Sequence, residues 1–373
     1  FSMLSLHCLF LHAAAPPAIY TPSLHDALPI SAGAGVRGGP CHRLVFANGR
    51  FVSRPSDIGA LPPGVRLQSL ADAVADEAGF MEPDFARGSE RADGSRGVGG
   101  DAVDGSMWGH VRAGGKSVRA AMNMRMARQE LLVDLGKLDE LDFIREEGGD
   151  LHIGAMTTKR TVEFSPVVEN TQPLMHAATI LIAHPQIRNR GTVGGSVAHA
   201  DPAAEYPAVA LLLEAEITAK GSNGERRIAA SDFFISYCTT ALEEGELLTQ
   251  LRIPAMAPGT GWSFKEFSRR HGDFALAGVG VTLNLDAAGH CENTKIVGFA
   301  LGPTPIRAAA LEEAINGERP SPELFAAACH KMADGIEDPT SDVHASVEYR
   351  RDLAATLAER ACAEAVGRAG TQA

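Results

Sequence analysis

The sequence predicts an α+β fold, in which a mixed region of short strands and helices precedes a block of strands and then a block of helices. Apolar runs at residues 131–135 and 151–155 have the length and composition of strands. Farther along the chain, Val281, Leu283 and Leu285 alternate with polar residues, which is typical of a half-buried strand. The last part of the chain is helical in pattern, so strands and helices are segregated there.

The individual elements follow from local signals. A helix at 173–183 has Pro173 in its first turn, where a missing amide donor is tolerated, and carries apolar residues at helical spacing. A short buried helix at 207–214 leads into a strand at 215–220, and a further strand is expected at 295–301. The helices expected in the carboxy-terminal part lie at residues 307–315, 322–332 and 347–366.

Composition excludes several classes of protein. A chain of 373 residues is long enough for two or three domains with real cores. The net charge of −12 argues against a nucleic-acid partner, which usually requires a basic face. No apolar run approaches the length of a transmembrane helix. The six cysteines are widely spaced, so we expect no metal or iron–sulfur ligands, but buried free thiols in a cytoplasmic protein.

Two glycine-rich motifs are the most informative features of the chain. Glycine has no Cβ and can adopt positive φ, so the backbone can approach a ligand closely. Consecutive amides in such a turn form a concave anion site, and two such sites suit a pyrophosphate that is held from two sides. The first motif consists of Ala113, Gly114, Gly115, Lys116 and Ser117, and the second of Thr192, Val193, Gly194, Gly195 and Ser196.

A nucleotide-triphosphate site is an alternative interpretation of the first motif. The phosphate-binding loop of that class, Gly-x-x-x-x-Gly-Lys-Ser, requires glycine at position 110, where this chain has His110. Gly109 lies one position too early, and no apolar strand precedes the loop. The pattern therefore favours the pyrophosphate interpretation.

With both motifs in view, residues 113–369 resemble the FAD-binding medium subunits of the molybdenum hydroxylases, the family of carbon monoxide dehydrogenase and xanthine dehydrogenase. Similar segments are Asn-Met-Arg-Met-Ala-Arg at 123–128, His-Ile-Gly-Ala-Met-Thr at 152–157 and Ala-Asp-Pro-Ala-Ala-Glu at 200–205. The resemblance implies a PCMH-type FAD-binding domain of two subdomains at 113–258, the first of them truncated. It also implies a carboxy-terminal domain of sheet plus helices at 259–369.

The resemblance also implies a function. Such a subunit holds FAD, receives electrons from the 2Fe–2S clusters of a small partner subunit, and passes them to NAD, a quinone or oxygen. A large partner subunit with a molybdenum cofactor oxidises the substrate. The protein would hold FAD, set its potential and expose the ring to an acceptor. No residue of this chain is expected to be catalytic or to bind a metal.

Further FAD contacts are implied residue by residue. Glu205 matches the acidic residue that contacts the ribityl or adenosine part, with Asp201 as a competitor that could instead form an Asp-Pro turn. Leu248 matches an apolar residue near the isoalloxazine ring, or is ordinary strand core. Lys265 matches a lysine near the flavin, or is a solvated lysine. Arg188 either neutralises phosphate or pairs with a carboxylate.

The amino-terminal third does not match this family. Residues 1–32 are interpreted as a sequence artefact, because part of them resembles translated sequencing adapter. Residues 33–112 are expected to be a non-family segment, partly similar to a Suf iron–sulfur assembly protein and ending in a linker. Within it, Asn48 and Gly49 predict a hairpin turn and Ser69 begins a helix, which is alternatively the family's own first helix. An inert chimera that cannot bind FAD is therefore the alternative function.

Overall fold

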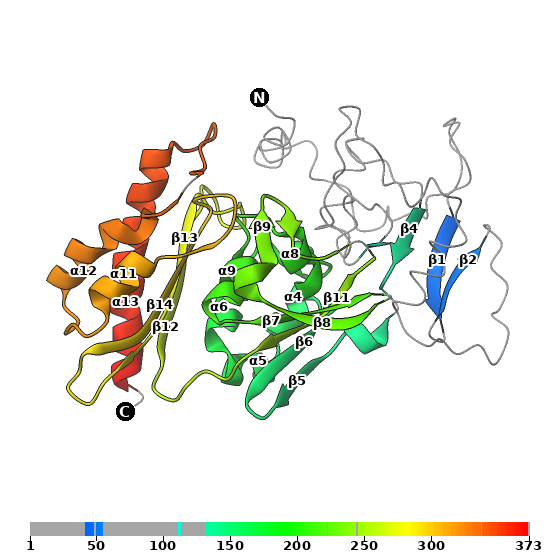
Figure 1. The fold of residues 1–373 in the computed structure, drawn as a ribbon, viewed down its shortest axis with the longest axis horizontal. Helices are drawn as coiled ribbons and strands as arrows, with labels where there is room; N and C mark the ends of the chain where they lie inside the picture. Colours follow the sequence, from blue (N-terminus) through cyan, green and yellow to red (C-terminus); the bar gives the residue numbers. More distant parts are fainter. Residues whose placement is uncertain are drawn as a thin grey trace.

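The computed structural model describes residues 42–47, 50–54, 111–112 and 131–371, apart from positions 137, 222, 244 and 337; side chains are described from residue 135 to residue 369, with the same gaps. Two larger units follow each other along the chain, and each combines a sheet with helices (Figure 1). The predicted α+β class is confirmed.

The first unit contains a five-stranded sheet in the order β5-β6-β11-β7-β8, in which all neighbours are antiparallel. Its helices lie on one side of the sheet, toward the second unit (Figure 1). The strands are β5 (Ile144–Glu147), β6 (Asp150–Gly154), β7 (Glu216–Gly221), β8 (Gly224–Ala229) and β11 (Leu247–Ile253). The helices are α4 (Lys159–Glu163), α5 (Pro166–Thr171), α6 (Pro173–Leu181), α7 (Pro185–Arg188), α8 (Val193–His199), α9 (Glu205–Leu212) and α10 (Ala230–Phe233).

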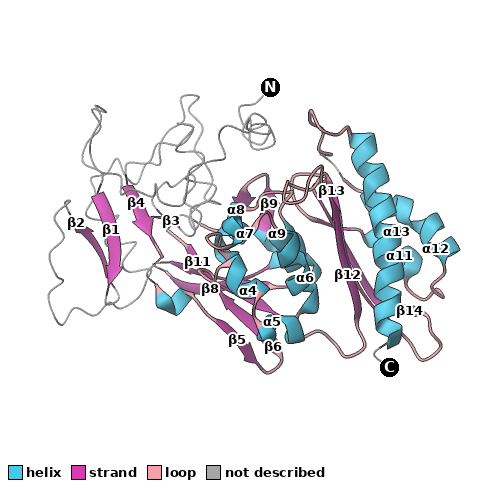
Figure 2. Cartoon of the chain, turned by 180° about the vertical axis from the view of Figure 1, so that it is seen from behind, coloured by secondary structure: helices cyan, strands magenta, loops and turns pink. Residues whose placement is uncertain are grey.

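The second unit contains a four-stranded antiparallel sheet in the order β12-β13-β14-β15. Helix α13 runs along one face of this sheet, as the two opposite views show (Figures 1 and 2). The strands are β12 (Gly261–Phe267), β13 (Ala277–Leu285), β14 (Cys291–Phe299) and β15 (Ile306–Arg307). The helices are α11 (Ala309–Ile315), α12 (Pro322–Ala328), the 3₁₀ helix η4 (Cys329–Ala333) and α13 (Val347–Thr371).

The opposite face of the second sheet packs on the first unit. Helices α6 and α9 contact β12, β13 and β14, and Phe264 stacks on Phe299 with ring centroids 5.3 Å apart. Both rings belong to the buried apolar cluster of the first unit. The predicted strand at 281–285 is confirmed as part of β13. Because β13 is covered on both faces, Thr282 is only 6% exposed, so the expectation that its polar side is exposed was wrong at this residue.

Several predicted helices end earlier than the sequence pattern indicates. Helix α6 ends at Leu181 because Ile182 is extended and Ala183 has a φ of 45°. Helix α9 begins two residues before Pro207 and ends at Leu212, and Glu214 has a φ of 52°. The left-handed backbone conformation of Ala183 and Glu214 cannot continue an α-helix.

A small sheet extends outside the two larger units, in the order β2-β1-β4-β3. Strands β1 (His42–Ala47) and β2 (Arg50–Arg54) form the predicted hairpin, with Ala47 opposite Arg50. Strand β1 also pairs in parallel with β4 (Leu131–Asp134), which is flanked by β3 (Val111–Arg112). Strands from residues 42–54 and from residues 111–134 thus share one sheet. A last pair, β9 (Phe234–Ser236) and β10 (Thr239–Thr240), forms a sheet of its own, and the helix predicted after Ser69 lies outside the described residues.

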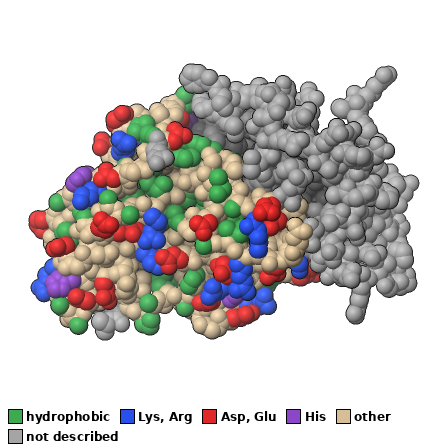
Figure 3. Space-filling model, viewed as in Figure 1, with side chains coloured by type: hydrophobic (Ala, Val, Ile, Leu, Met, Phe, Trp, Pro, Cys, Tyr) green, Lys and Arg blue, Asp and Glu red, His purple; other side chains and the backbone are tan. Residues whose placement is uncertain are grey.

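Acidic and basic side chains are interspersed over the described surface shown in Figure 3. Among the described residues, no helix combines the length and the apolar character that crossing a membrane requires.

We predict that Gly261→Ala destabilises the second unit by about 1–3 kcal/mol, because an added Cβ would collide with the backbone carbonyl of Ala365 on α13. The control is Gly367→Ala on the same helix, where an added Cβ meets nothing within 4 Å and helix propensity should raise stability by roughly 0.5–1 kcal/mol. Urea unfolding measures both. Equal stabilities of the two variants would contradict this packing.

Candidate functional site

The second glycine motif begins a helix. Thr192 is the N-cap of α8, and its Oγ1 accepts a hydrogen bond from the amide of Gly195 at 3.1 Å. Thr192 also forms an isolated bridge with Thr158, the N-cap of α4. The motif was expected to form a turn, and the structure shows a helix start instead.

The amides of this motif donate within the chain. The amide of Val193 donates to the carbonyl of Thr157 at 2.9 Å, and that of Gly194 to the carbonyl of Ala155 at 2.9 Å. The amide of Ser196 donates to the carbonyl of Thr192 at 3.2 Å. The end of β6 and the helix cap thus engage these amides, and the contact of this motif with a pyrophosphate stays a prediction. Ser196 has a partly exposed side chain, whereas Thr192, Val193, Gly194 and Gly195 are buried.

Gly194 allows α8 to approach the end of β6. A Cβ on Gly194 would lie 2.5 Å from the Cβ of Ala155 and 2.8 Å from its carbonyl oxygen. Glycine is thus required here for close packing of a helix on a strand, in addition to any ligand role.

The two acidic candidates lie between α8 and α9. Asp201 is buried, and its Oδ1 accepts a hydrogen bond from the amide of Ala203 at 2.8 Å, which forms the turn that was the alternative interpretation. Glu205 begins α9 and is only 7% exposed. Burial raises the pKa of the Glu205 carboxyl to about 7, against the opposing charge of Lys159 and with a smaller contribution from Asp201.

Lys159 is a residue of this site that sequence reasoning missed. It begins α4, its amide donates to the carbonyl of Gly191 at 2.8 Å, and its ammonium lies 5.7 Å from the centre of the Tyr206 ring. The positive charge of Lys159 lowers the pKa of Glu205 and so opposes the effect of burial. Only the neighbouring Thr-Thr pair, which predicts a helix cap, could have drawn attention to this position.

Lys265 and Glu266 point to opposite faces of β12. The Lys265 ammonium pairs with Glu364 on α13, which also accepts from the Ser263 hydroxyl at 3.1 Å. Glu266 follows it on the strand and therefore faces the first unit. Burial, together with the charge of Glu205, raises the pKa of Glu266 to about 9. The structure thus brings Glu266, rather than Lys265, toward Glu205.

Leu248 is fully buried in β11 and belongs to the core of the first unit. A register shift of the β11–β7 pairing lies between Leu248 and Gln250, and the carbonyl of Thr249 accepts from the amide of Ala155 at 2.9 Å. Core packing, the alternative interpretation, is what the structure shows for Leu248; its contact with a flavin stays a prediction.

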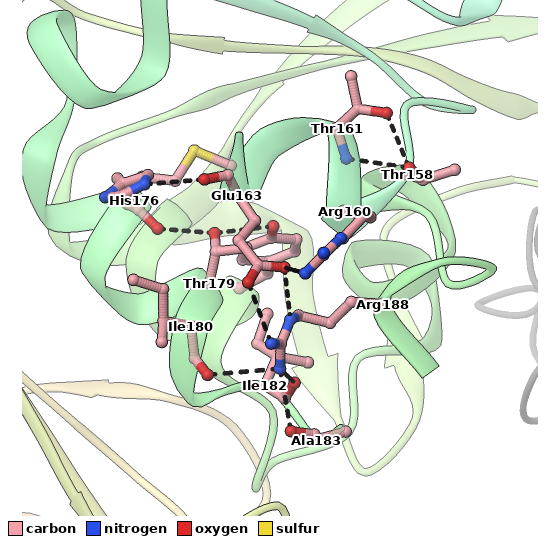
Figure 4. A network of polar contacts seen from close by, with 12 residues as sticks. Thr158, Arg160, Thr161, Glu163, His176, Thr179, Ile180, Ile182, Ala183 and Arg188 are labelled. Carbon is pink, nitrogen blue, oxygen red and sulfur yellow. Dashed lines mark hydrogen bonds and ion pairs between the residues drawn. The ribbon is translucent and has the colours of Figure 1, made fainter. Parts of the chain in front are cut away.

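Arg188 pairs with a carboxylate (Figure 4). Its Nε and Nη2 donate to Glu163 at 2.9 and 3.2 Å, and burial leaves the residue 4% exposed. The side-chain hydrogen bonds that Arg188 donates are the main reason why the pKa of the Glu163 carboxyl is lowered. The interpretation of Arg188 as a carboxylate partner is therefore confirmed.

The first glycine motif lies outside the described residues; it consists of Ala113, Gly114, Gly115, Lys116 and Ser117. The distance in space between the two motifs is therefore a prediction. Within the part of the chain that the structure describes, no group of three or more His, Cys, Asp or Glu side chains is arranged to hold a metal ion.

Comparison with known proteins decides the family. Residues 110–256 match the FAD-binding domain of molybdopterin dehydrogenases, and residues 262–365 match the carboxy-terminal domain of the CO dehydrogenase flavoprotein. The 6-hydroxypseudooxynicotine dehydrogenase complex subunit alpha of Paenarthrobacter nicotinovorans is 39% identical over 72% of this chain and 90% of its own length. The chain belongs to the FAD-binding subunits of the molybdenum hydroxylases.

Further relatives support this membership. The carbon monoxide dehydrogenase medium chain of Hydrogenophaga pseudoflava is 36% identical over 67% of this chain and 86% of its own length. A solved structure of carbon monoxide dehydrogenase from the same organism superposes with a TM-score of 0.67 at 38% identity, covering 69% of this chain and 89% of that one. Quinoline 2-oxidoreductase from Pseudomonas putida 86 also gives a TM-score of 0.67, at 33% identity, covering 70% and 90%. The chain is thus an oxidoreductase flavoprotein subunit with the domains of this family.

We predict that Gly194→Ala destabilises the protein by about 1–3 kcal/mol, because its Cβ would overlap Ala155. Combining it with Ala155→Gly should restore part of the stability, since one of the colliding atoms is then absent. Thermal unfolding of the single and double variants measures this. A double variant no more stable than Gly194→Ala would contradict the proposed contact.

We predict that Glu266→Gln makes stability less dependent on pH. The pKa of Glu266 in the folded protein is about 9, against an ordinary 4.5. The stability that this carboxyl contributes is therefore fully present below about pH 4.5 and is lost as the pH rises toward 9. Glutamine cannot ionise, so the melting temperature of the variant relative to wild type should rise between pH 6 and pH 9 by roughly 2–4 °C. Exposed Glu313→Gln is the control. Parallel pH profiles for wild type and Glu266→Gln would refute the burial of this carboxyl.

Proposed function

We propose that the chain is the FAD-carrying electron-transfer subunit of a molybdenum-containing dehydrogenase. Electrons would arrive from the 2Fe–2S clusters of a small partner subunit and leave to an external acceptor, which is NAD, a quinone or oxygen. A large partner subunit with the molybdenum cofactor would oxidise the substrate. Such a complex would be cytoplasmic. The main support is membership of a family whose FAD-binding domain matches residues 110–256.

The described side chains fit FAD in their chemistry. Glu205 is a buried carboxylate that can accept from sugar hydroxyls, and Lys159 is a nearby cation that can balance phosphate charge. Lys159 lies beside the start of α8, since its amide donates to Gly191 and Thr158 bridges to Thr192. Its charge acts on Glu205, which begins α9. Bound FAD supplies the capacity to accept two electrons and to release them singly or together.

The proposed binding site therefore combines two motifs and a set of side chains. Residues 113–117 and Ser196 would contact the pyrophosphate, while Thr192 and Gly194 shape the start of α8 beneath it. Glu205 would accept from the ribityl or adenosine hydroxyls, and Asp201 would hold the turn that leads to it. Leu248 and Lys265 remain predicted flavin contacts, and their side chains lie in the β11 core and beside Glu364, respectively.

We predict that Glu205→Leu weakens FAD binding roughly 10- to 100-fold, because hydrogen bonds to a charged acceptor contribute about 1.5–3 kcal/mol. Titration of apoprotein with FAD, followed by quenching of flavin fluorescence, gives the dissociation constant. The control is Glu225→Leu, which removes an exposed carboxylate on β8 of the same unit. Equal affinities for the two variants would remove Glu205 from the site.

A further inference from the structure

Two buried arginines make the same kind of contact at the two ends of one segment, residues 183–202. Arg188 Nη1 donates to the carbonyls of Ile182 and Ala183 at 2.8 and 3.0 Å, while the rest of its guanidinium is bound by Glu163 (Figure 4). Each positive charge inside a protein requires such a partner. Because Glu163 already balances the charge of Arg188, this residue acts on the backbone rather than on a phosphate.

Arg350 repeats this arrangement from the second unit. It lies in the first turn of α13 and is 2% exposed. Its Nη1 donates to the carbonyls of Ala300, at 3.1 Å, and Leu276, and its Nη2 to Asp342 at 2.7 Å. The amide of Ala300 in turn donates to the carbonyl of Pro202 at 2.8 Å. Arg350 therefore holds Ala300 in place, and Ala300 in turn binds Pro202, the last residue of the segment.

One of the carbonyls held by each arginine belongs to an alanine in an unusual backbone conformation. Ala183 has a φ of 45° and Ala300 a φ of 61°, a left-handed region that residues with a Cβ rarely occupy. Such conformations persist only where the surroundings hold them. Ala200, inside the segment, has a φ of 49° as well.

The segment between these two points carries the site. It contains Thr192, Gly194, Ser196 and Asp201, and Glu205 lies three residues beyond its end. A shift of either end would move the start of α8 relative to Lys159 and Glu205. The middle of the segment is held separately, by the amides of Val193 and Gly194 and the carbonyl of Gly191, so the two arginines act at its ends.

We propose that Arg188 and Arg350 are positioning residues for the cofactor site, which hold Ala183 and Ala300 in the left-handed conformation and thereby orient residues 183–202. This inference rests on the proposed FAD-binding function. Lysine at either position would keep the charge but could not bind a carboxylate and two carbonyls with one planar group.

The test compares Arg188→Lys, Arg350→Lys and the matched control Arg226→Lys. Arg226 also binds a carboxylate and a carbonyl, Glu246 at 2.7 and 2.8 Å and Ala241 at 2.7 Å, but it holds no left-handed residue. FAD titration of each apoprotein gives the dissociation constant, and thermal unfolding reports overall stability. We expect the dissociation constant to rise at least about tenfold for the first two variants and to stay within about twofold for the control. Equal effects in all three, or none in the first two, would overturn the proposal.

Amide hydrogen exchange on the apoproteins provides a second measurement that requires no cofactor. Arg188→Lys should accelerate exchange at Val193 and Gly194, whose bonds anchor α8, and leave the paired strands β7 and β11 unchanged. Unchanged exchange at Val193 and Gly194 would overturn the proposal. If wild-type protein bound no FAD, the proposed function would fail, and the exchange result alone would then decide whether the arginines hold the segment.

Discussion

The site depends on two backbone hydrogen bonds that join the start of α8 to the end of β6. The amides of Val193 and Gly194 donate to the carbonyls of Thr157 and Ala155, and this contact is possible only because Gly194 has no side chain. It places Thr192 next to Thr158 and therefore places α8 next to Lys159. The same glycine that suggests a phosphate cradle in the sequence thus has a second role, since it lets a helix lie directly on a strand.

Burial between the two units determines the charge state of the acidic groups. The second sheet is covered by α13 on one face and by the first unit on the other, so Glu205 and Glu266 lie where water is largely excluded. Both carboxyls consequently favour the neutral form more than an exposed glutamate does. Lys159 opposes this effect at Glu205, which keeps that group close to its midpoint near neutral pH. The acidic residues are therefore sensitive to any charge that enters the site.

The sequence was sufficient for the fold class and for most central elements, because apolar periodicity and proline positions are local signals. It was insufficient where tertiary contacts determine which side chains are buried and which partners they meet. Thr282 is polar and yet buried, since neither face of β13 is exposed. Lys265 was identified by motif alone, but strand alternation directs it to Glu364 and directs Glu266 toward the first unit. Lys159 acts on Glu205, and Arg188 pairs with Glu163; both contacts join residues distant in the chain, which no local pattern reveals.

The most direct test of the account is the visible absorbance spectrum of the purified chain after addition of FAD and removal of free flavin. We predict a bound-flavin spectrum with a shifted fine structure and one FAD per chain, because the family's FAD-binding domain spans residues 110–256. A folded chain that retains no flavin would contradict the proposed function and would support an inert chimera, in which the amino-terminal third replaces a part that FAD binding requires.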